Sequence, residues 1–145
     1  MELFDSESLE FLLGQVIRLH YHRTHMLLRE LGIYPGQPSI LFLLWEKDGR
    51  SQKELAEKIG LKPATVTVML NRMEKAGWLD RRPDPEDLRV SRVNLTKQAK
   101  EIRPRVEQLL KTIYEESFKG FTDQEKVLLR RFLMHMRNNL GQVCG

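Results

Sequence analysis

The sequence predicts a mainly α-helical chain that contains one small β-hairpin. Apolar residues at helical spacing fill two short segments on either side of Gly60. A segment that alternates apolar and polar residues, 91–95, follows a turn rich in proline and acidic residues. Longer segments with helical periodicity precede and follow this region. The middle of the chain therefore predicts helix, turn, helix and hairpin, flanked by long helices.

The first short helix begins at Ser51 and ends at Gly60. Ser51 followed three residues later by Glu54 forms a capping box, in which each side chain bonds the other's backbone N–H. The apolar residues that follow at helical spacing are Leu55, Ala56 and Ile59. Gly60 suits the left-handed conformation that closes a helix.

The second helix begins at Pro63, because proline is favoured at the first helical position. Val66, Leu70 and Met73 fall on one face. The other sides carry short hydroxyls, an amide and a guanidinium, which are groups that read base edges and bind phosphates: Thr65, Thr67, Asn71 and Arg72. Taken alone, the pattern also fits a small amphipathic helix with a solvated polar face.

A hairpin follows the second helix. Trp78 and Leu79 begin a strand, and the second strand spans 91–95. The segment between them, PDPEDLR, has two prolines and three acids, which favour a turn over a central strand. The hairpin therefore projects, with Arg81, Arg82 and Arg89 near its tip. A projecting basic hairpin beside two short helices predicts a winged helix-turn-helix.

The charge distribution supports a polyanionic partner. The chain has a net charge of +4. Residues 62–105 carry eleven Lys or Arg and six Asp or Glu, so the rest of the chain is slightly negative. Such a patch attracts phosphates and makes affinity fall with salt. A basic surface without a partner is the alternative.

The N-terminal segment predicts a helix of about 25 residues with two apolar faces. Asp5 and Ser6 are its candidate caps. Its apolar positions are Leu9, Leu12, Leu13, Val16, Ile17, Leu19, Met26, Leu27, Leu28 and Leu31. Because one domain covers only one face, we expect a second copy of the chain to cover the other.

Three histidines, His20, His22 and His25, lie in this helix. Only His22 and His25 share a face, and no carboxylate stands one turn away from both, so a structural or solvated role is favoured over a metal site. If a dimer forms a pocket here, the candidate ligand-binding residues are Tyr21, His22, His25 and Trp45. Trp45 itself is better interpreted as a core residue.

The segment 32–38 contains two glycines and two prolines and breaks the chain before a buried helix over 39–45. Asp48 and Gly49 end that helix.

Two more helices are expected after the hairpin. Thr96 caps a helix with a kink near Pro104. Thr122 and Glu125 form a second capping box, which begins a last helix that Gly141 ends.

We divide the chain into an N-terminal dimerisation helix (1–34), a winged helix-turn-helix (35–96) and C-terminal helices that complete the dimerisation region (97–145). The single cysteine, Cys144, excludes a disulfide framework and fits a reducing compartment. No run approaches the ~20 apolar residues of a membrane span, and no signal segment begins the chain, so we expect a cytoplasmic protein. The sequence indicates no metal, cofactor or catalytic residue.

The run from Ser51 to Thr96 resembles the multiple antibiotic resistance regulator (MarR) family. The resemblance rests on Leu-Ala-Glu in the first helix, Pro-Ala-Thr-Val-Thr opening the second, Glu-Lys-Ala-Gly-Trp-Leu entering the hairpin, and Asp-x-Arg followed by a strand ending in Leu-Thr. It implies a homodimeric transcriptional regulator that binds double-stranded DNA, with the second helix in the major groove and the wing arginine in the minor groove. It also implies a small-molecule effector.

A dimer of this kind reads an inverted repeat whose half-sites lie about one helical turn, ~34 Å, apart. We expect Thr65, Thr67 and Asn71 to contact bases, Arg72, Lys75, Arg81 and Arg82 to contact phosphates, and Asp87 to orient Arg89. The full set of expected DNA-contacting residues is Ser51, Lys62, Pro63, Ala64, Thr65, Thr67, Val68, Asn71, Arg72, Lys75, Arg81, Arg82, Asp87 and Arg89.

The chain departs from its relatives at two of these positions. Val68 stands where many carry an arginine, and Lys62 where they often carry a capping side chain. Lysine supplies no acceptor and meets an unfavourable helix dipole, so we expect a DNA phosphate to bind it.

Two other classes of function compete with this interpretation. An enzyme would need a phosphate loop, a metal triad or an activated nucleophile, none of which the sequence offers. A winged helix that binds a protein is the stronger rival, because the hairpin turn carries the acids Asp84, Glu86 and Asp87. The operator sequence, the regulated genes, the effector and the choice between repression and activation are not encoded in these patterns.

Overall fold

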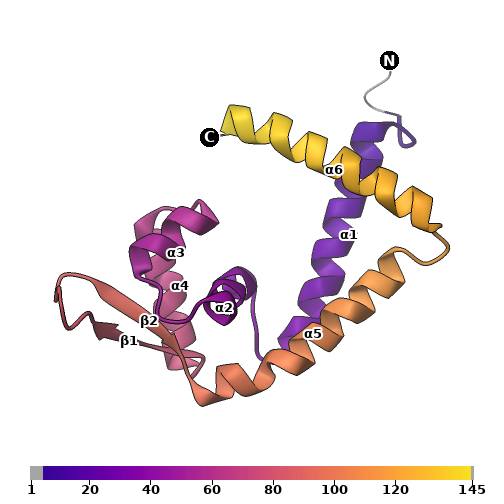
Figure 1. Cartoon of the computed structure of the whole chain (residues 1–145). Coiled ribbons are helices and arrows are strands. Elements are labelled where there is room, and N and C mark those ends of the chain that lie inside the picture. The colour runs from indigo at the N-terminus through magenta and orange to yellow at the C-terminus, as the bar shows by residue number, and fades with distance from the viewer. Residues whose placement is uncertain (1–4, 145) are drawn as a thin grey trace. The chain divides into compact units, whose positions relative to one another are not determined.

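The computed structural model describes residues 5–144 and confirms a mainly helical chain with one two-stranded hairpin (Figure 1). The elements, in order, are α1 (Leu9–Glu30), α2 (Gln37–Glu46), α3 (Gln52–Ile59), α4 (Pro63–Lys75), β1 (Leu79–Pro83), β2 (Ser91–Leu95), α5 (Lys97–Ser117) and α6 (Asp123–Cys144). The chain separates into two compact units, one reaching to Leu110 and the other beginning at Lys111.

The start of α1 differs from the sequence prediction. Ser8 is the N-cap, and its Oγ accepts a hydrogen bond from the Phe11 backbone N–H at 3.2 Å. Asp5 was wrongly predicted as a cap, together with Ser6. Its carboxylate accepts from the Glu7 N–H at 3.0 Å and so forms a turn before the helix. Aspartate bonds its own turn two residues on as readily as it caps a helix, which displaces the helix start to Leu9.

The helix-turn-helix forms as predicted. Ser51 Oγ accepts from the Glu54 N–H at 3.1 Å and caps α3. Gly60 ends α3 with φ +78°, a left-handed conformation that favours glycine. Pro63 is the first residue of α4, and Lys62 is its N-cap. The carboxylate of Glu54 does not close the capping box but pairs with Arg92 at 3.4 Å.

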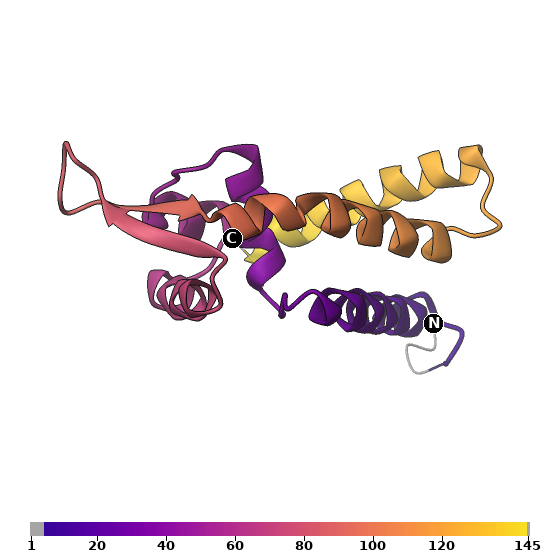
Figure 2. The ribbon, with the colours of Figure 1, turned by 90° about the horizontal axis from the view of Figure 1, so that it is seen from below.

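The hairpin is antiparallel, and its register pairs Leu79 with Leu95 and Pro83 with Ser91. The segment before α3 extends this small sheet, because the Val93 N–H donates to the Arg50 carbonyl at 2.9 Å. The hairpin projects beyond α3 and α4 (Figure 2). One edge of the wing is therefore attached through backbone bonds to the segment that leads into the first helix of the helix-turn-helix.

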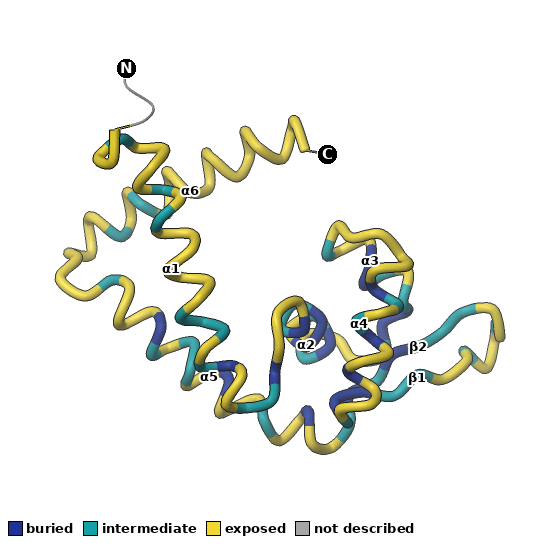
Figure 3. Tube along the Cα trace, turned by 180° about the vertical axis from the view of Figure 1, so that it is seen from behind, coloured by how far each residue is buried: buried dark blue, intermediate teal, exposed yellow. Residues whose placement is uncertain are grey.

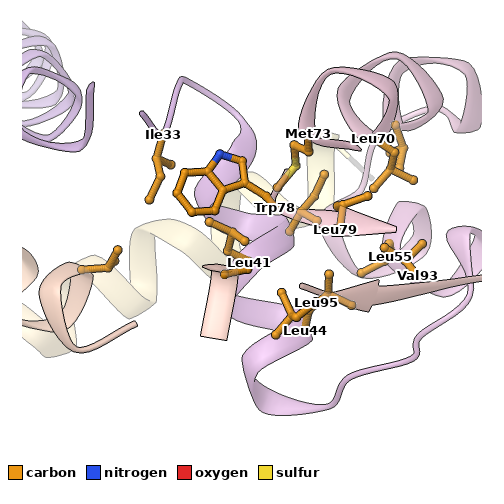
Figure 4. Packing of buried hydrophobic residues seen from close by; sticks show 14 of the residues in the cluster. Ile33, Leu41, Leu44, Leu55, Leu70, Met73, Trp78, Leu79, Val93 and Leu95 are labelled. Atoms are coloured by element: carbon orange, nitrogen blue, oxygen red, sulfur yellow. The ribbon is translucent and has the colours of Figure 1, made fainter. Parts of the chain in front are cut away.

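The core of the first unit is built from α2, α3, α4 and the strands, with contributions from α1 and α5 (Figure 3). Trp78 is buried among apolar side chains that include Leu41, Met73 and Leu79 (Figure 4). Its indole N–H donates to the Gly32 carbonyl at 3.3 Å, so its polar atom is satisfied. This packing holds α4 and the hairpin in one block.

The C-terminal helices confirm the two predicted N-terminal caps and overturn one predicted helix end. Thr122 Oγ1 accepts from the Glu125 N–H at 3.1 Å, and Glu125 returns the bond to the Thr122 N–H at 3.0 Å. Gly141 does not end α6, which continues to Cys144. Glycine permits a left-handed turn but does not require one. Thr96 caps α5 through the Ala99 N–H at 3.3 Å. The helix runs unbroken past Pro104, whose kink stays a prediction.

Candidate nucleic-acid interface

The outer face of α4 is polar and exposed, as its sequence pattern predicts. Val66, Leu70 and Met73 are buried on the inner face. The exposed residues at the start and along the outer face include Lys62, Pro63, Ala64, Thr65, Val68, Asn71, Arg72 and Lys75. A helix that presents such side chains on an otherwise packed block has the shape and chemistry for the major groove.

The start of α4 lacks a side-chain cap, since no hydrogen bond from the Lys62 side chain satisfies the first N–H groups. One turn later, the Thr67 hydroxyl donates to the Pro63 carbonyl at 3.0 Å. The same hydroxyl accepts from Gln52 Nε2 at 3.3 Å. The only proton of the Thr67 hydroxyl is therefore used within the protein, so towards a base this side chain offers its methyl group and an acceptor but no donor.

Arg81 lies on β1 but bonds residues of α3 and α4. Its guanidinium donates to Glu74 Oε2, with Nε at 2.9 Å and a terminal nitrogen at 2.7 Å. It also donates to Asn71 Oδ1 and, at 3.4 Å, to Gln52 Oε1. Only 21% of its side chain is exposed. The structure thus places this predicted phosphate ligand inside a network of acceptors from its own chain.

Arg82, the next residue, has the opposite environment. Its side chain is 74% exposed and, among residues 5–144, pairs only with Asp80, at 3.1 Å. The contrast follows from the strand alternation that points neighbouring side chains to opposite faces. Arg82 is therefore the more accessible of the two guanidinium groups.

The hairpin turn orients Arg89 as the sequence predicts. Asp87 accepts two bonds from its guanidinium, from Nε at 3.0 Å and from a terminal nitrogen at 3.1 Å. These bonds from Arg89, its backbone N–H included, lower the pKa of Asp87, so the carboxylate is charged at neutral pH. The Arg89 side chain is 91% exposed. A fixed but solvent-facing guanidinium at a hairpin tip suits insertion into a narrow groove.

Five charged residues that form ion pairs on and beside the hairpin were not among the predicted site residues. Arg92 pairs with Asp84 at 2.9 Å and with Glu54 at 3.4 Å. The pKa of Asp84 is lowered, first by the Glu86 backbone N–H and then by Arg92. The buried Arg50 pairs with Glu46 at 3.0 Å and donates to the Leu43 carbonyl at 3.1 Å. No local sequence pattern predicts ion pairs between different elements. The sequence does show the two arginines themselves, Arg50 before the capping box and Arg92 on the second strand.

Ser51, also predicted to contact DNA, is buried and occupied as the cap of α3. Its role in the structure is to fix where α3 begins.

The predicted ligand-binding residues divide into two environments. The ring centroids of Tyr21 and His25, both on α1, lie 4.2 Å apart. Burial, and then the charge of Arg29, lowers the pKa of His25, which favours its neutral form. His22 is exposed on the same helix. Trp45 donates its indole N–H to the Ala99 carbonyl at 3.0 Å and packs against the core. It is therefore a structural residue, as the sequence predicts.

Within residues 5–144, no cluster of three or more His, Cys, Asp or Glu side chains is arranged to bind a metal. None of the helices in the same range is long and apolar enough to span a bilayer.

Comparison with known proteins identifies the family. The MarR family profile matches residues 33–91, which include α2 to α4 and β1. The HTH-type transcriptional regulator YdgJ of Bacillus subtilis (strain 168) is 32% identical over 112 residues, which are 77% of this chain and 68% of that protein. The HTH-type transcriptional repressor IacR of Pseudomonas putida is 28% identical over 128 residues, which are 88% and 77% of the two chains.

A solved structure shares the fold. The transcriptional repressor CouR, bound to a 23-mer DNA duplex, aligns with a TM-score of 0.76 and 24% identity over 94% of each chain. The matched sequence, the exposed polar face of α4 and the arginine-tipped hairpin agree. The chain belongs to the MarR family of helix-turn-helix transcriptional regulators, which are DNA-binding proteins and not enzymes.

Proposed function

We propose that the chain is a homodimeric cytoplasmic repressor that binds an inverted-repeat operator and is released by a small ligand. The observation that carries the DNA-binding geometry is the arrangement of α4 and the hairpin in one packed block, with polar side chains exposed on α4 and Arg89 exposed at the tip. In this proposal α4 enters the major groove and the hairpin the minor groove of each half-site.

The contacts divide by chemistry. Thr65 and Asn71 reach base edges, while Val68 and the Thr67 methyl offer apolar contact to a thymine methyl. Phosphates are bound by the exposed cations Lys62, Arg72, Lys75 and Arg82. Arg89 enters the minor groove. Arg81 leaves the predicted set of phosphate ligands, because its guanidinium already bonds three side chains of this chain.

The exposed apolar side chains of the terminal helices support the proposed homodimer. We propose residues 1–34 and 97–145 as its dimerisation region. Large apolar side chains on both are exposed in the single chain, including Leu9 (88%) on α1 and Val127 (69%) on α6. Within the second unit, a groove of about 470 Å³ between the end of α5 and α6 is lined by Phe118, Leu133 and other apolar residues. A second copy would remove this surface from water and so stabilise the pair.

Repression and ligand release rest on the family. IacR is named a transcriptional repressor, and CouR is a repressor bound to DNA. A ligand can release DNA only if it binds the released state of the dimer more tightly than the DNA-bound state. We assign the ligand to a pocket that the dimer completes beside Tyr21, His22 and His25.

A protein-binding winged helix is the second candidate, favoured by the acids of the hairpin turn. Two of these three acids are paired within the chain, Asp84 with Arg92 and Asp87 with Arg89. Their charges are therefore balanced locally, which weakens the case for an acidic docking surface.

A gel-shift titration tests the proposal. The purified protein is mixed with the DNA upstream of its own gene and with a scrambled duplex of equal length, at about 50 and 200 mM salt. We expect preferential binding of the upstream DNA and a loss of affinity of roughly 10³–10⁵ between the two salt concentrations, as for a protein with 6–10 phosphate contacts. Equal affinity for both duplexes with little salt dependence would instead favour the protein-binding alternative.

A further inference from the structure

The side chains that face Arg81 form one connected hydrogen-bond network across α3, α4 and β1. Arg81 donates to Glu74 and Asn71 on α4 and to Gln52 on α3. Gln52 in turn donates to Thr67, one turn before Asn71 on α4. The network therefore lies along one edge of the face of α4 that we propose reads DNA.

Arg81 fixes the direction of every bond in this network. A guanidinium has only donors, so the amide atom of Asn71 that faces it must be the oxygen. The same reasoning assigns Oε1 of Gln52 to Arg81 and Nε2 to Thr67. The Thr67 hydroxyl must then accept from Gln52, and its own proton goes to the Pro63 carbonyl.

We propose that Arg81 is a positioning residue that sets base specificity by limiting Asn71 to the role of a donor. Asn71 is exposed and its Oδ1 accepts from Arg81, so Nδ2 is the amide atom left to bond a partner, and it can only donate. Asparagine recognises adenine by donating to N7 while its oxygen accepts from the N6 amino group. An amino group that approached Oδ1 here would meet the positive guanidinium.

The preferred partner of Asn71 is therefore an edge that only accepts. Guanine presents N7 and O6 side by side in the major groove, so its edge matches the two N–H protons of Nδ2. This inference rests on the proposed function, since it names what the same face reads. It changes the expected base at one position of each half-site from adenine to guanine.

The neighbouring Arg82 provides a matched control. Arg81 and Arg82 carry the same charge, but Arg81 is 21% exposed and bonds three side chains, whereas Arg82 is 74% exposed and, in the described part of the chain, pairs only with Asp80. A phosphate ligand contributes to the salt dependence equally for all sequences, and a positioning residue contributes to the choice of one base.

The experiment selects binding sites from a pool of random DNA duplexes with the full-length protein and three variants. For the wild type we expect a guanine preference at one position of each half-site. Arg81→Met should reduce that preference about tenfold and leave the slope of log affinity against log salt unchanged. Arg82→Met should lower the slope by about one and leave all base preferences unchanged.

Asn71→Asp removes the amide donor while keeping an oxygen that can bond Arg81. An aspartate oxygen still accepts from Arg81, so thermal stability should be retained, but the Nδ2 donor is gone. We expect Asn71→Asp to lose the guanine preference at the same position, and this variant decides the question if Arg81→Met does not fold.

Unchanged base preferences in Asn71→Asp, or a lower salt slope with unchanged preferences in Arg81→Met, would overturn the inference. A wild-type preference for adenine at that position would overturn it as well. If the wild type enriches no sequence at all, the proposed function itself fails.

Discussion

Lys62 is an unusual N-cap for a helix that is expected to meet DNA. Its side chain satisfies none of the first N–H groups of α4, and its charge lies at the positive end of the helix dipole. Such a residue is unfavourable in the free protein and favourable when a phosphate is present.

Lys62→Ser should therefore stabilise the free protein and weaken its complex with DNA. We expect a gain of about 0.5–2 kcal/mol in the free energy of unfolding, measured with urea, because serine caps the helix. The salt slope of DNA binding should fall by about one as one phosphate contact is lost. Lys119→Ser, which removes the same charge from the second unit, is the control. An unaltered slope in Lys62→Ser would exclude the phosphate contact.

Asp87 and Arg89 form a pair whose titration can be measured directly. The bonds from Arg89 lower the pKa of Asp87 below its ordinary value of 3.8. The stabilisation from this pair is therefore complete above about pH 3.8 and is lost as the pH falls through the lowered value.

Arg89→Met should return the pKa of Asp87 toward 3.8, as measured by NMR titration of the side-chain carboxyl carbon. Arg82→Met, which leaves the Asp87 bonds intact, should not change it. A pKa of Asp87 that is equally low in Arg89→Met would mean that backbone N–H groups alone set it.

At the scale of elements, Gly60 connects the two helices of the helix-turn-helix. A Cβ added at Gly60 would meet no atom within 4 Å, so only the backbone conformation, φ +78°, resists a side chain. A substitution at Gly60 therefore measures the free energy needed to place a side-chain-bearing residue in the left-handed conformation, without a contribution from steric clashes.

Gly60→Ala should lower the free energy of unfolding by about 1–2 kcal/mol, and Gly60→Asn by less, because asparagine tolerates the left-handed region. Thermal unfolding of the three proteins measures both differences. Equal stability of Gly60→Ala and the wild type would show that the turn can adopt another conformation.

The sequence predicted the elements well because their signals are local. Caps, glycines and prolines adjacent to apolar periods located α3, α4, the strands and the start of α6. The errors at Asp5 and Gly141 have the same origin. Aspartate can form a turn instead of a cap, and glycine can continue a helix instead of ending it, and the surrounding residues decide between these conformations. The candidate site was predicted as a surface, but the network around Arg81 was not, because its members are separated by up to 29 positions.

At the scale of the whole molecule, the exposed apolar surface of α6 is the feature that a single chain does not explain. None of the described residues of α6 is buried in the single chain. Large apolar side chains at intervals of three or four positions form an exposed stripe along it: Leu128, Phe132, Met136, Leu140 and Val143. From the sequence we assign this helix to the dimerisation region, and in our proposal a second copy of the chain covers the stripe.

Phe132→Glu should separate the proposed dimer into single chains. At micromolar concentration we expect the wild type to sediment at about twice 17.1 kDa and Phe132→Glu at 17.1 kDa, because burying an unpaired charge in the interface is unfavourable. Gln124→Glu, which adds the same charge to an exposed polar position, should remain a dimer. A wild type that sediments as a single chain would refute the proposed assembly.

Only residues 76–78 connect α4 to β1, and Trp78 among them is buried. With Arg81 bonded to α4 as well, the helix and the hairpin cannot change their mutual distance without breaking the core. In the dimer that we propose, a releasing ligand would then act by altering the separation of two such rigid bodies, and the bases that each body contacts would not depend on the ligand. Under this proposal, new binding sites could evolve through exposed positions such as Val68 while the response to the ligand stays the same.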